Sequence, residues 1–416
     1  MQALTFDISA WRWLSCKALA MTWPRVYLSA LGGLKLRDIP VPQLPGPDWV
    51  RLRTRLGGIC GTDLGLILLR THPANILRSF TSFPVILGHE NVATVDQVGD
   101  RVDGWRVGQR VCVEPSLSCA VRGIDPPCGP CQRGLFSLCE GFVTGPLPRG
   151  TMIGLNNFTG GSWAPFFVAH QSQLHAVPDS LNDESAVLVD PLACALHGVL
   201  RHRPRHDDKV LIQGGGIIGL GVALALGALD SRAHVTALVR HRFQAERMQA
   251  CGADEIIVAP RRAGSAQRYD QVAATVQGRR VPAAFGNQAL IGGFDAVYDC
   301  VGTGVSLTDA MKFTRPRGTT VALGTSQICL VDTTSLWFKE LNVVGVYGRQ
   351  MESTGQATPV HTYRMMLDMI ADGRLDVADL LTHTFKPNQY RQALALLTTR
   401  QRSPAVKVAF RHSAKS

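Results

Sequence analysis

The feature that most constrains the fold is a run of glycines in the middle of the chain. Residues 214–219 read Gly-Gly-Gly-Ile-Ile-Gly and fit the pattern G-x-G-x-x-G, a weak signal alone because glycines are common in turns. Here the pattern follows an apolar strand expected over residues 209–213 and precedes a stretch of helical spacing that ends near Leu229. A glycine turn between a strand and a helix is typical of dinucleotide binding.

Several residues of this turn have a physical role in such binding. Gly214 permits the tight turn, Gly216 lets the backbone approach a pyrophosphate, and Gly219 allows the helix to pack against the strand. Free N–H groups at the helix N-terminus, where Ile217 and Ile218 stand, attract phosphates. We therefore expect this turn to bind a dinucleotide rather than to serve as an ordinary loop.

The end of the following strand bears on which dinucleotide is bound. A carboxylate about 20 residues after the glycines would accept a hydrogen bond from the ribose 2′-OH of NAD. Val239 stands there instead, with Arg240 next and Arg242 two positions further. Because guanidinium groups match phosphate geometry, the sequence favours NADP, with NAD still possible. The alternative is that these arginines only flank an exposed helix start.

The chain divides into two kinds of pattern. Strands alternate with helices in the second half, with strands expected at 209–213, 233–239, 294–299, 319–323 and 341–346, which predicts a doubly wound parallel α/β sheet over residues 190–347. Short strands at 34–39, 49–56, 91–98 and 108–113 predict a β-rich domain over residues 1–189. Residues 348–416 carry helical spacing and a final strand at 405–410. Residues 11–29 predict an added amphipathic element.

A second glycine-lined turn, residues 57–63, brings together a thiol, a hydroxyl and a carboxylate in Cys60, Thr62 and Asp63. A lone cysteine is usually a small buried hydrophobe. However, His89 and Glu90 follow a short apolar run, and Asp190 stands in another. Cysteine, histidine and carboxylate that converge from separate loops predict a catalytic zinc site with one coordination position open.

A separate cysteine cluster lies in the loop 112–140 and consists of Cys119, Cys128, Cys131 and Cys139. Four thiolates in one loop predict a closed zinc site, which has no room for substrate and stabilises its lobe. Cys112 is an alternative to Cys119 as the first ligand. A nucleic-acid-binding zinc ribbon is the competing interpretation, but basic and aromatic residues are sparse in the loop.

Composition limits the possible partners. The excess of 43 basic over 32 acidic residues gives +11, but the charges are scattered, so we expect no nucleic acid partner. The longest apolar run is too short to cross a bilayer, and we expect no membrane partner. Eleven cysteines without a secretion signal predict a reducing compartment, the cytoplasm.

Taken in order, these motifs resemble the zinc-dependent medium-chain alcohol dehydrogenase superfamily, in its threonine/sorbitol dehydrogenase-like branch. The resemblance rests on the turns around Cys60 and His89, the cysteine loop, Asp190-Pro191-Leu192, the glycine turn and Asp299-Cys300-Val301-Gly302. It implies a GroES-like catalytic domain interrupted by a Rossmann domain, with the active site in the cleft between them. It also implies a homodimer or homotetramer.

The resemblance implies roles for individual residues. Cys60 and His89 match the first two catalytic zinc ligands, and Asp190 stands where relatives carry Cys, Glu or Asp. Glu90 matches an acidic residue near the metal that can ligate it, and Thr62 matches a hydroxyl that relays the substrate proton. Asp63 resembles a residue that supports the ligands, and Val301 and Gly302 are expected to contact the cofactor. The chain departs from the family in the spacing between Cys119 and Cys128 and in a longer N-terminal region.

The predicted activity is zinc-dependent hydride transfer between an alcohol, or its aldehyde or ketone, and a nicotinamide dinucleotide. One alternative is a zinc-independent NADPH reductase of alkenes or quinones on the same fold. Another is a non-catalytic cofactor-binding protein. The joint presence of Cys60, His89 and Asp190 disfavours both alternatives, while the substrate and the preferred direction stay open.

Overall fold

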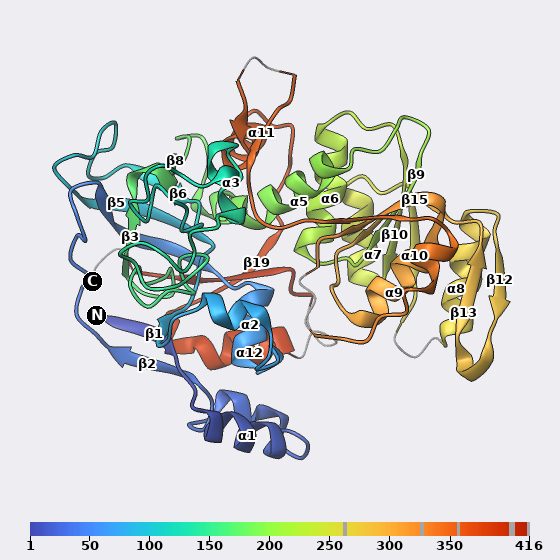
Figure 1. Ribbon diagram of the computed structural model, residues 1–416, viewed down its shortest axis with the longest axis horizontal. Helices are drawn as coiled ribbons and strands as arrows, with labels where there is room; N and C mark the ends of the chain where they lie inside the picture. Colours follow the sequence, from blue (N-terminus) through green and yellow to red (C-terminus); the bar gives the residue numbers. More distant parts are fainter. Residues whose placement is uncertain (261–263, 325–327, 356–357, 399–403, 414–416) are drawn as a thin grey trace. The chain divides into compact units, whose positions relative to one another are not determined.

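A computed structural model describes residues 1–260, 264–324, 328–355, 358–398 and 404–413 of the 416-residue chain. Contacts divide the chain into two units (Figure 1). Unit 1 comprises Met1–Asp190 and Arg349–Ser416, and unit 2 comprises Pro191–Gly348. Unit 2 is therefore an insertion between two parts of unit 1. Each junction lies one residue later than the boundary that the sequence predicts.

Unit 2 is built on a six-stranded sheet in the order β11-β10-β9-β14-β15-β16, and every neighbouring pair is parallel. In chain order this is 3-2-1-4-5-6, which is typical of the Rossmann fold and confirms the predicted sheet. The order reverses between β9 and β14. The strands are β9 (Lys209–Gln213), β10 (His234–Val239), β11 (Glu255–Val258), β14 (Phe294–Asp299), β15 (Thr314–Ala322) and β16 (Asn342–Gly345).

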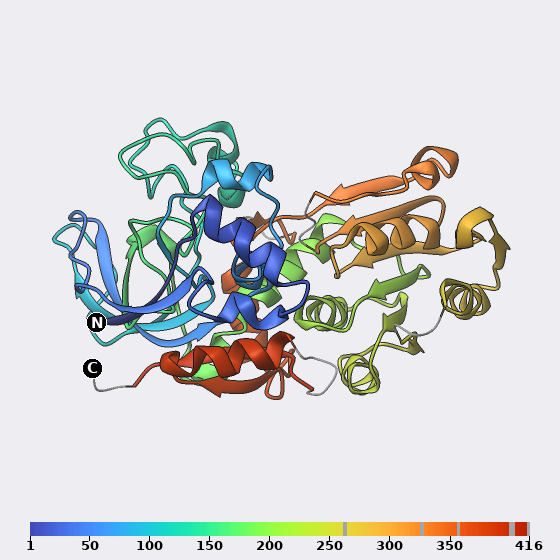
Figure 2. The same cartoon turned by 90° about the horizontal axis from the view of Figure 1, so that it is seen from below.

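Helices flank this sheet and close its core (Figure 2). They are α6 (Ile217–Ala228), α7 (Arg242–Ala250), α8 (Ser265–Thr275), α9 (Gly304–Phe313) and α10 (Thr334–Phe338). Leu211 and Val297 of the central strands pack with Tyr269 of α8 and Phe313 of α9. An antiparallel hairpin, β12 (Arg279–Pro282) and β13 (Gln288–Ile291), carries the 3-10 turn η5 (Ala284–Gly286) at its tip and was not predicted.

Unit 1 contains a seven-stranded sheet in the order β19-β20-β3-β5-β6-β8, with β7 also paired to β3. Its last strand in the sequence, β20, pairs antiparallel with β3 and parallel with β19, so the segment after unit 2 completes a sheet begun before it. The strands are β3 (Trp49–Gly58), β5 (Asn91–Val98), β6 (Arg110–Val113), β7 (Phe166–His170), β8 (Leu174–Ala176), β19 (Leu381–Phe385) and β20 (Lys407–Arg411).

Smaller elements complete unit 1. A three-stranded sheet has the order β2-β1-β4, formed by β1 (Gln2–Phe6), β2 (Leu34–Asp38) and β4 (Val85–Ile86), and β17 (Met351–Glu352) pairs with β18 (Val360–His361). The α-helices are α1 (Ala10–Leu19), α2 (Gly61–Ile67), α3 (Gly129–Gln132), α4 (Asp183–Ala186), α11 (Thr362–Ala371) and α12 (Tyr390–Thr398). Helix α5 (Val189–Arg201) begins at the end of the first part of unit 1 and continues into unit 2. The 3-10 turns are η1 (Pro24–Leu28), η2 (Ile76–Phe80), η3 (Phe136–Leu138), η4 (Gln171–Gln173) and η6 (Pro387–Gln389).

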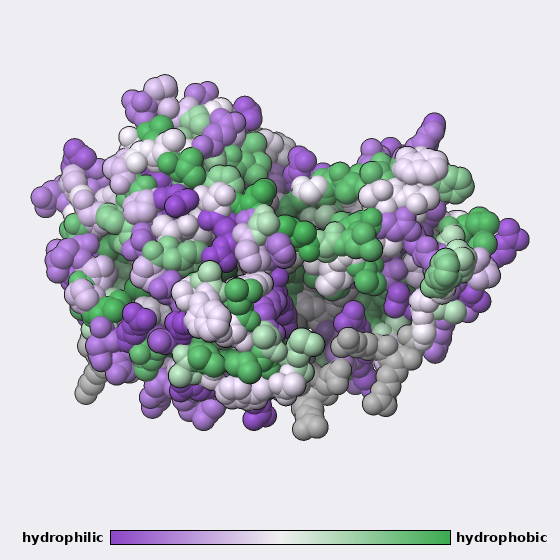
Figure 3. All heavy atoms as spheres, turned by 60° about the horizontal axis from the view of Figure 1, so that its bottom comes forward, coloured by the Kyte–Doolittle hydropathy of each residue, from purple (hydrophilic) through white to green (hydrophobic). Residues whose placement is uncertain are grey.

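The predicted element at residues 11–29 is a short helix, α1, followed by the turn η1. Hydrophobic and hydrophilic side chains are intermixed on the face that Figure 3 brings forward. No helix among the described residues is long and apolar enough to cross a membrane.

Candidate metal centres and cofactor site

Cys60 stands between β3 and α2 and caps the N-terminus of that helix. Its backbone N–H donates to Asp63 Oδ2 at 2.9 Å, which fixes the turn, and its Sγ lies 3.7 Å from Thr62 Oγ1. The half-buried thiol and the half-buried hydroxyl therefore share one helix start. This is the arrangement that the glycine-lined turn predicts.

His89 and Glu90 reach the same place from the neighbouring strand, because they precede β5, which pairs with β3, and Gly58 N–H donates to the Glu90 carbonyl at 3.0 Å. They follow β4 through a turn at Gly88, whose φ of +93° favours glycine, and both side chains are buried. Gly58 lies so close that a Cβ there would stand 2.0 Å from Glu90 Oε2. The candidate ligand atoms of Cys60, His89 and Glu90 all lie within 4.8 Å of one another. The structure thus brings three of the predicted ligands together.

These three residues fit a zinc ion. Among the described residues, the buried atoms Glu90 Oε2 and His89 Nδ1 have no hydrogen-bond partner, which is costly unless something else binds them. Burial opposes a charge on His89, but the negative charges of Asp63, 3.8 Å away, and of Cys60 outweigh it and raise the pKa of His89 to about 10. The surroundings favour a positive charge here, and thiolate, imidazole and carboxylate suit zinc.

Lys407 is a member of this site that the sequence reasoning missed. It lies in β20, is buried, and its Nζ donates to Glu90 Oε1. Burial raises the pKa of Glu90, and the Lys407 ammonium partly offsets that effect. A signal was present, because a single lysine stands between Val406 and Val408 in the final strand predicted at 405–410. A buried lysine needs a carboxylate partner.

Asp190, the fourth residue predicted as a ligand, has hydrogen-bond and ion-pair partners of its own. It stands in the first turn of α5, and its Oδ1 accepts a hydrogen bond from Tyr363 at 2.5 Å and pairs with Arg349 at 2.7 Å. Arg349 also lies 3.8 Å from Glu114. The structure does not bring Asp190 into the group of Cys60, His89 and Glu90, although its charge contributes to raising the pKa of His89.

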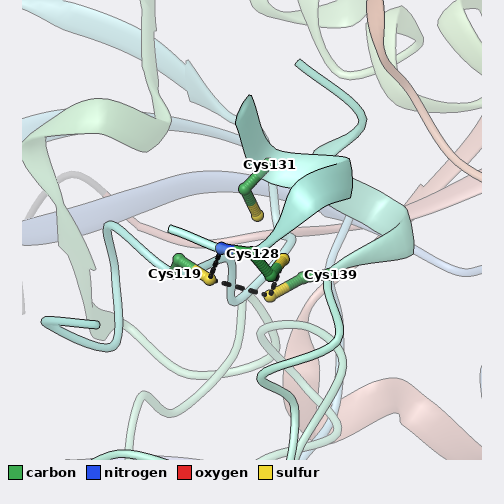
Figure 4. A group of neighbouring side chains, drawn as sticks. All are labelled: Cys119, Cys128, Cys131 and Cys139. Atoms are coloured by element: carbon green, nitrogen blue, oxygen red, sulfur yellow. Dashed lines mark hydrogen bonds between the residues drawn. The ribbon is translucent and has the colours of Figure 1, made fainter. Parts of the chain in front are cut away.

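The four cysteines of the loop come together as predicted (Figure 4). Cys139 Sγ lies 3.6 Å from Cys119 Sγ and 3.9 Å from Cys128 Sγ, close to the roughly 3.8 Å between sulfurs around a tetrahedral zinc. Cys112 lies elsewhere, where its thiol donates to the Ala186 carbonyl. The group therefore contains Cys119 and not Cys112.

The chemistry of these thiols fits a cation as well. Burial raises the pKa of Cys139 to about 12, and the neighbouring thiol of Cys119 adds to this effect. Backbone N–H groups of Glu140 and Gly141 donate to Cys128 and Cys139 at 3.4 and 3.2 Å. Four thiolates cannot coexist here without a positive ion, and zinc supplies that charge.

Arg122 connects the cysteine loop to the segment that follows it, residues 144–150, and was also missed by the sequence reasoning. It is completely buried, and its guanidinium donates to five backbone carbonyls at 2.9 to 3.2 Å. The acceptors are Leu117, Thr144, Leu147, Pro148 and Gly150. Burial lowers the pKa of Arg122, and the nearby thiols of Cys139 and Cys119 oppose that change.

The glycine turn of unit 2 has the geometry that its pattern predicts. Gly214 has a φ of +111°, and Gly216 caps α6, whose first residues are Ile217 and Ile218. A Cβ at Gly219 would lie 1.8 Å from the Gly214 carbonyl oxygen, so the helix needs glycine there. The turn leaves the carboxyl end of β9, at the point where the strand order reverses. Dinucleotides bind at such points.

The remaining cofactor candidates follow the neighbouring strands. Asp299 ends β14, and its Oδ1 accepts the N–H groups of Val301 and Gly302 at 3.0 and 3.4 Å. Arg240 and Arg242 follow β10, and both residues are exposed. Arg242 Nε lies 3.8 Å from Glu246 Oε1. The end of β10 thus presents basic groups to an anion, and no carboxylate stands at that position in the sequence.

Comparisons with known proteins agree with this architecture. The model described as the alcohol dehydrogenase GroES-like domain matches residues 46–179, and the one described as zinc-binding dehydrogenase matches residues 216–372. The L-idonate 5-dehydrogenase of Vitis vinifera is 27% identical over 391 residues, covering 92% of this chain and 93% of that protein. The sorbitol dehydrogenase of Arabidopsis thaliana is 27% identical over 388 residues, covering 92% and 94%.

A solved structure supports the fold. The zinc-binding dehydrogenase from Sinorhizobium meliloti 1021 was determined bound to NADP and is 24% identical to this chain. The match covers 92% of this chain and 98% of that chain, with a TM-score of 0.69. The family models and the solved structure confirm the predicted fold class, and the family models and the related dehydrogenases confirm the predicted activity. The chain belongs to the zinc-dependent medium-chain alcohol dehydrogenase superfamily and is an oxidoreductase that transfers hydride between an alcohol or its carbonyl product and a nicotinamide dinucleotide.

Proposed function

We propose that Cys60, His89 and Glu90 hold the catalytic zinc of this enzyme, and that Cys119, Cys128, Cys131 and Cys139 hold a structural zinc. The observation that carries the proposal is the buried Glu90 carboxylate: one of its oxygens lies within 4.8 Å of the other two ligand atoms, and its Oε2 has no hydrogen-bond partner among the described residues. Asp190 acts on this site through its charge, while Arg349 and Tyr363 hold its carboxylate.

The chain's own residues prepare this site for alcohol oxidation. Zinc bound there would polarise the substrate oxygen as a Lewis acid, and the dinucleotide would carry the hydride. Thr62, beside the Cys60 thiol, accepts the hydroxyl proton of the substrate and passes it outward. Asp63 fixes the Cys60 backbone and faces His89, and the Lys407 ammonium donates to Glu90 and partly offsets the cost of burying its charge.

Counting zinc in purified variants tests this division of roles. We expect two zinc ions per wild-type chain, one for each group of ligands, and one after either Cys60→Ser or Cys128→Ser. Cys251→Ser, which removes a thiol outside both groups, should keep both ions. Elemental analysis is the measurement, and a Cys60→Ser protein that retains the full zinc content would refute the catalytic site.

We propose that the preferred cofactor is NADP, bound through Arg240. The Arg240→Ala variant should bind NADP about tenfold more weakly, because a charge-assisted hydrogen bond to phosphate is lost, while NAD binding stays unchanged. Arg242→Ala is the matched comparison, since that side chain already faces Glu246. Fluorescence titration gives both dissociation constants. An equal loss for NAD and NADP would show that Arg240 does not contact the 2′-phosphate.

We propose a polyhydroxylated alcohol as substrate. The names of two relatives, an L-idonate and a sorbitol dehydrogenase, support this class. A panel of polyols, sugar acids, amino alcohols and simple alcohols, run with each dinucleotide, tests it. Activity confined to simple alcohols would exclude this class.

We propose that the enzyme is a homodimer joined through unit 2. β16 ends the order of the sheet, and exposed apolar residues gather in nearby segments, among them Trp337, which is 69% exposed, Phe338 and Val343. Apolar surface of this kind is typical of protein interfaces. The Trp337→Glu variant should therefore be monomeric in light scattering coupled to chromatography. Phe285→Ser, at an exposed site on the β12–β13 hairpin, should leave the mass unchanged.

We also propose a reducing compartment, the cytoplasm. The support is chemical: the chain carries eleven cysteines, all present as free thiols, and the two metal groups need reduced sulfur. Fractionation of cells with an antibody against the chain tests this placement.

A further inference from the structure

Helix α1 has apolar side chains on the face that points to solvent. Trp11, Leu14 and Ala18 follow one another at helical spacing and are exposed, with Trp11 at 76%. A surface helix usually places polar groups there. Just after the helix, Met21 is 88% exposed. The exposed apolar side of this element is therefore unexplained by packing within the chain.

The opposite face of α1 accounts for how the helix is held. Cys16 is completely buried in the core of unit 1, and Trp13 and Ala20 pack against the same core. Arg12 donates to the carbonyls of Ala30 and Leu31 at 3.1 and 2.9 Å, which ties the helix to the segment that follows it. The helix is thus anchored on one side, and its outer side is presented in a defined orientation.

The charge of this region has one sign. Residues 8–37 contain the basic residues Arg12, Lys17, Arg25, Lys35 and Arg37 and no acidic residue, although Asp7 and Asp38 bound the stretch. In the folded helix, Lys17 lies with its ammonium 5.5 Å from the Trp13 ring, on the flank of the outer face. A surface that combines apolar and basic groups complements an anionic, partly apolar partner.

The aromatic content narrows the partner further. Two of the chain's seven tryptophans, Trp11 and Trp23, are exposed in this stretch, at 76% and 47%, while Trp13 and Tyr27 pack against the core. Trp and Tyr concentrate at the boundary between water and lipid, where an amphipathic ring is half hydrated. Purple and green side chains lie next to one another on the face in Figure 3, which brings the bottom of Figure 1, where α1 lies, forward.

Although the sequence alone predicted no membrane partner, we propose that the outer face of α1 (Trp11, Leu14, Lys17 and Ala18), together with the exposed Met21 and Arg25 that follow it, binds reversibly to membranes rich in anionic phospholipid. The helix lies on the headgroup region and does not cross the bilayer, in accord with the absence of a spanning helix among the described residues. The apolar side chains enter the interface, and the basic ones contact phosphate and carboxylate headgroups. The role concerns placement of the enzyme, so it is independent of the metal ligands and of the proposed substrate.

Co-sedimentation of the intact protein with vesicles tests the proposal. We expect binding to vesicles of phosphatidylcholine that contain about a third phosphatidylserine, weaker binding at high salt, and little binding to phosphatidylcholine alone. Two variants should each bind these vesicles at least about tenfold more weakly than the wild type. One is the apolar variant Trp11→Ser/Leu14→Ser/Met21→Ser, and the other is the charge variant Lys17→Gln/Arg25→Gln. Dehydrogenase activity in solution should be unchanged, because none of these residues belongs to the catalytic site.

Controls separate lipid binding from other effects. The double variant Phe285→Ser/Arg279→Gln changes a fully exposed apolar residue and a basic residue of the β12–β13 hairpin in unit 2, and it should bind vesicles like the wild type. Circular dichroism and activity verify that the variants fold. Absence of wild-type binding, or equal binding by the charge variant, would overturn the proposal. A wild type that ignores vesicles but loses self-association in the apolar variant would assign the surface to a second copy instead.

Discussion

Replacement of Lys407 by methionine is expected to destabilise unit 1 strongly when the catalytic site lacks its metal. In a Cys60→Ser background, which keeps the structural zinc, Lys407→Met should lower the free energy of unfolding by about 3–5 kcal/mol, because the buried Glu90 carboxylate loses the ammonium group that pairs with it. In the zinc-bound wild type the loss should be smaller, because the metal itself would neutralise Glu90. The comparison therefore tests Glu90 as a ligand.

The measurement is urea unfolding followed by tryptophan fluorescence, which reports on unit 1 because six of the seven tryptophans lie there. Lys386→Met, at an exposed lysine of the same unit, should change stability little. Adding Glu90→Gln to Lys407→Met should recover part of the loss, since the unpaired charge is removed. An identical loss with and without catalytic zinc would show that Glu90 is not a ligand.

Replacement of Arg122 by methionine is the second large effect that we expect. The change leaves five carbonyls without their donor in the interior of the cysteine lobe, and we expect a loss of at least about 4 kcal/mol in the free energy of unfolding. Zinc with four thiolates carries a net charge of about −2, which Arg122 partly balances. Structural zinc should therefore leave the variant faster.

Release of zinc to a coloured chelator, together with urea unfolding, measures both consequences. Arg122→Lys keeps the charge but has fewer donors, so it should fall between the wild type and Arg122→Met. Arg133→Met removes an exposed arginine from the same loop and should behave like the wild type. Equal rates of zinc release from Arg122→Met and from the wild type would show that Arg122 does not help to retain the structural zinc.

Local sequence patterns predicted the parts of the molecule that are formed by residues close together in the sequence. The glycine turn, the strand before it and the helix after it form one contiguous unit, so the Rossmann sheet follows from residues 209–229 and the alternation beyond them. The pair Cys128 and Cys131 predicted the cysteine cluster for the same reason. The choice between Cys112 and Cys119 required the structure, because β6 turns the Cys112 thiol toward Ala186.

Contacts across long separations escaped the sequence reasoning. Arg349 and Tyr363, which follow unit 2 in the sequence, hold Asp190, which precedes it, and no local pattern marks either residue. Strand β1 was missed because five residues carry too little periodicity, and the β12–β13 hairpin because its first strand, Arg279–Pro282, is largely polar. The ligand roles of Cys60, His89, Glu90 and Asp190 stay predictions, although the structure brings three of these residues together.

The pairing of β20 with β3 has a consequence for how a newly made chain acquires this site. Lys407 is separated from Glu90 by 317 residues, so at 5–20 residues per second a ribosome adds it roughly 15–60 s after Glu90. All of unit 2 emerges during that interval and has its whole sheet available. We therefore expect unit 2 to fold first. The sheet of unit 1 next to Cys60 and His89 stays incomplete until β20 has been synthesised and pairs with β3.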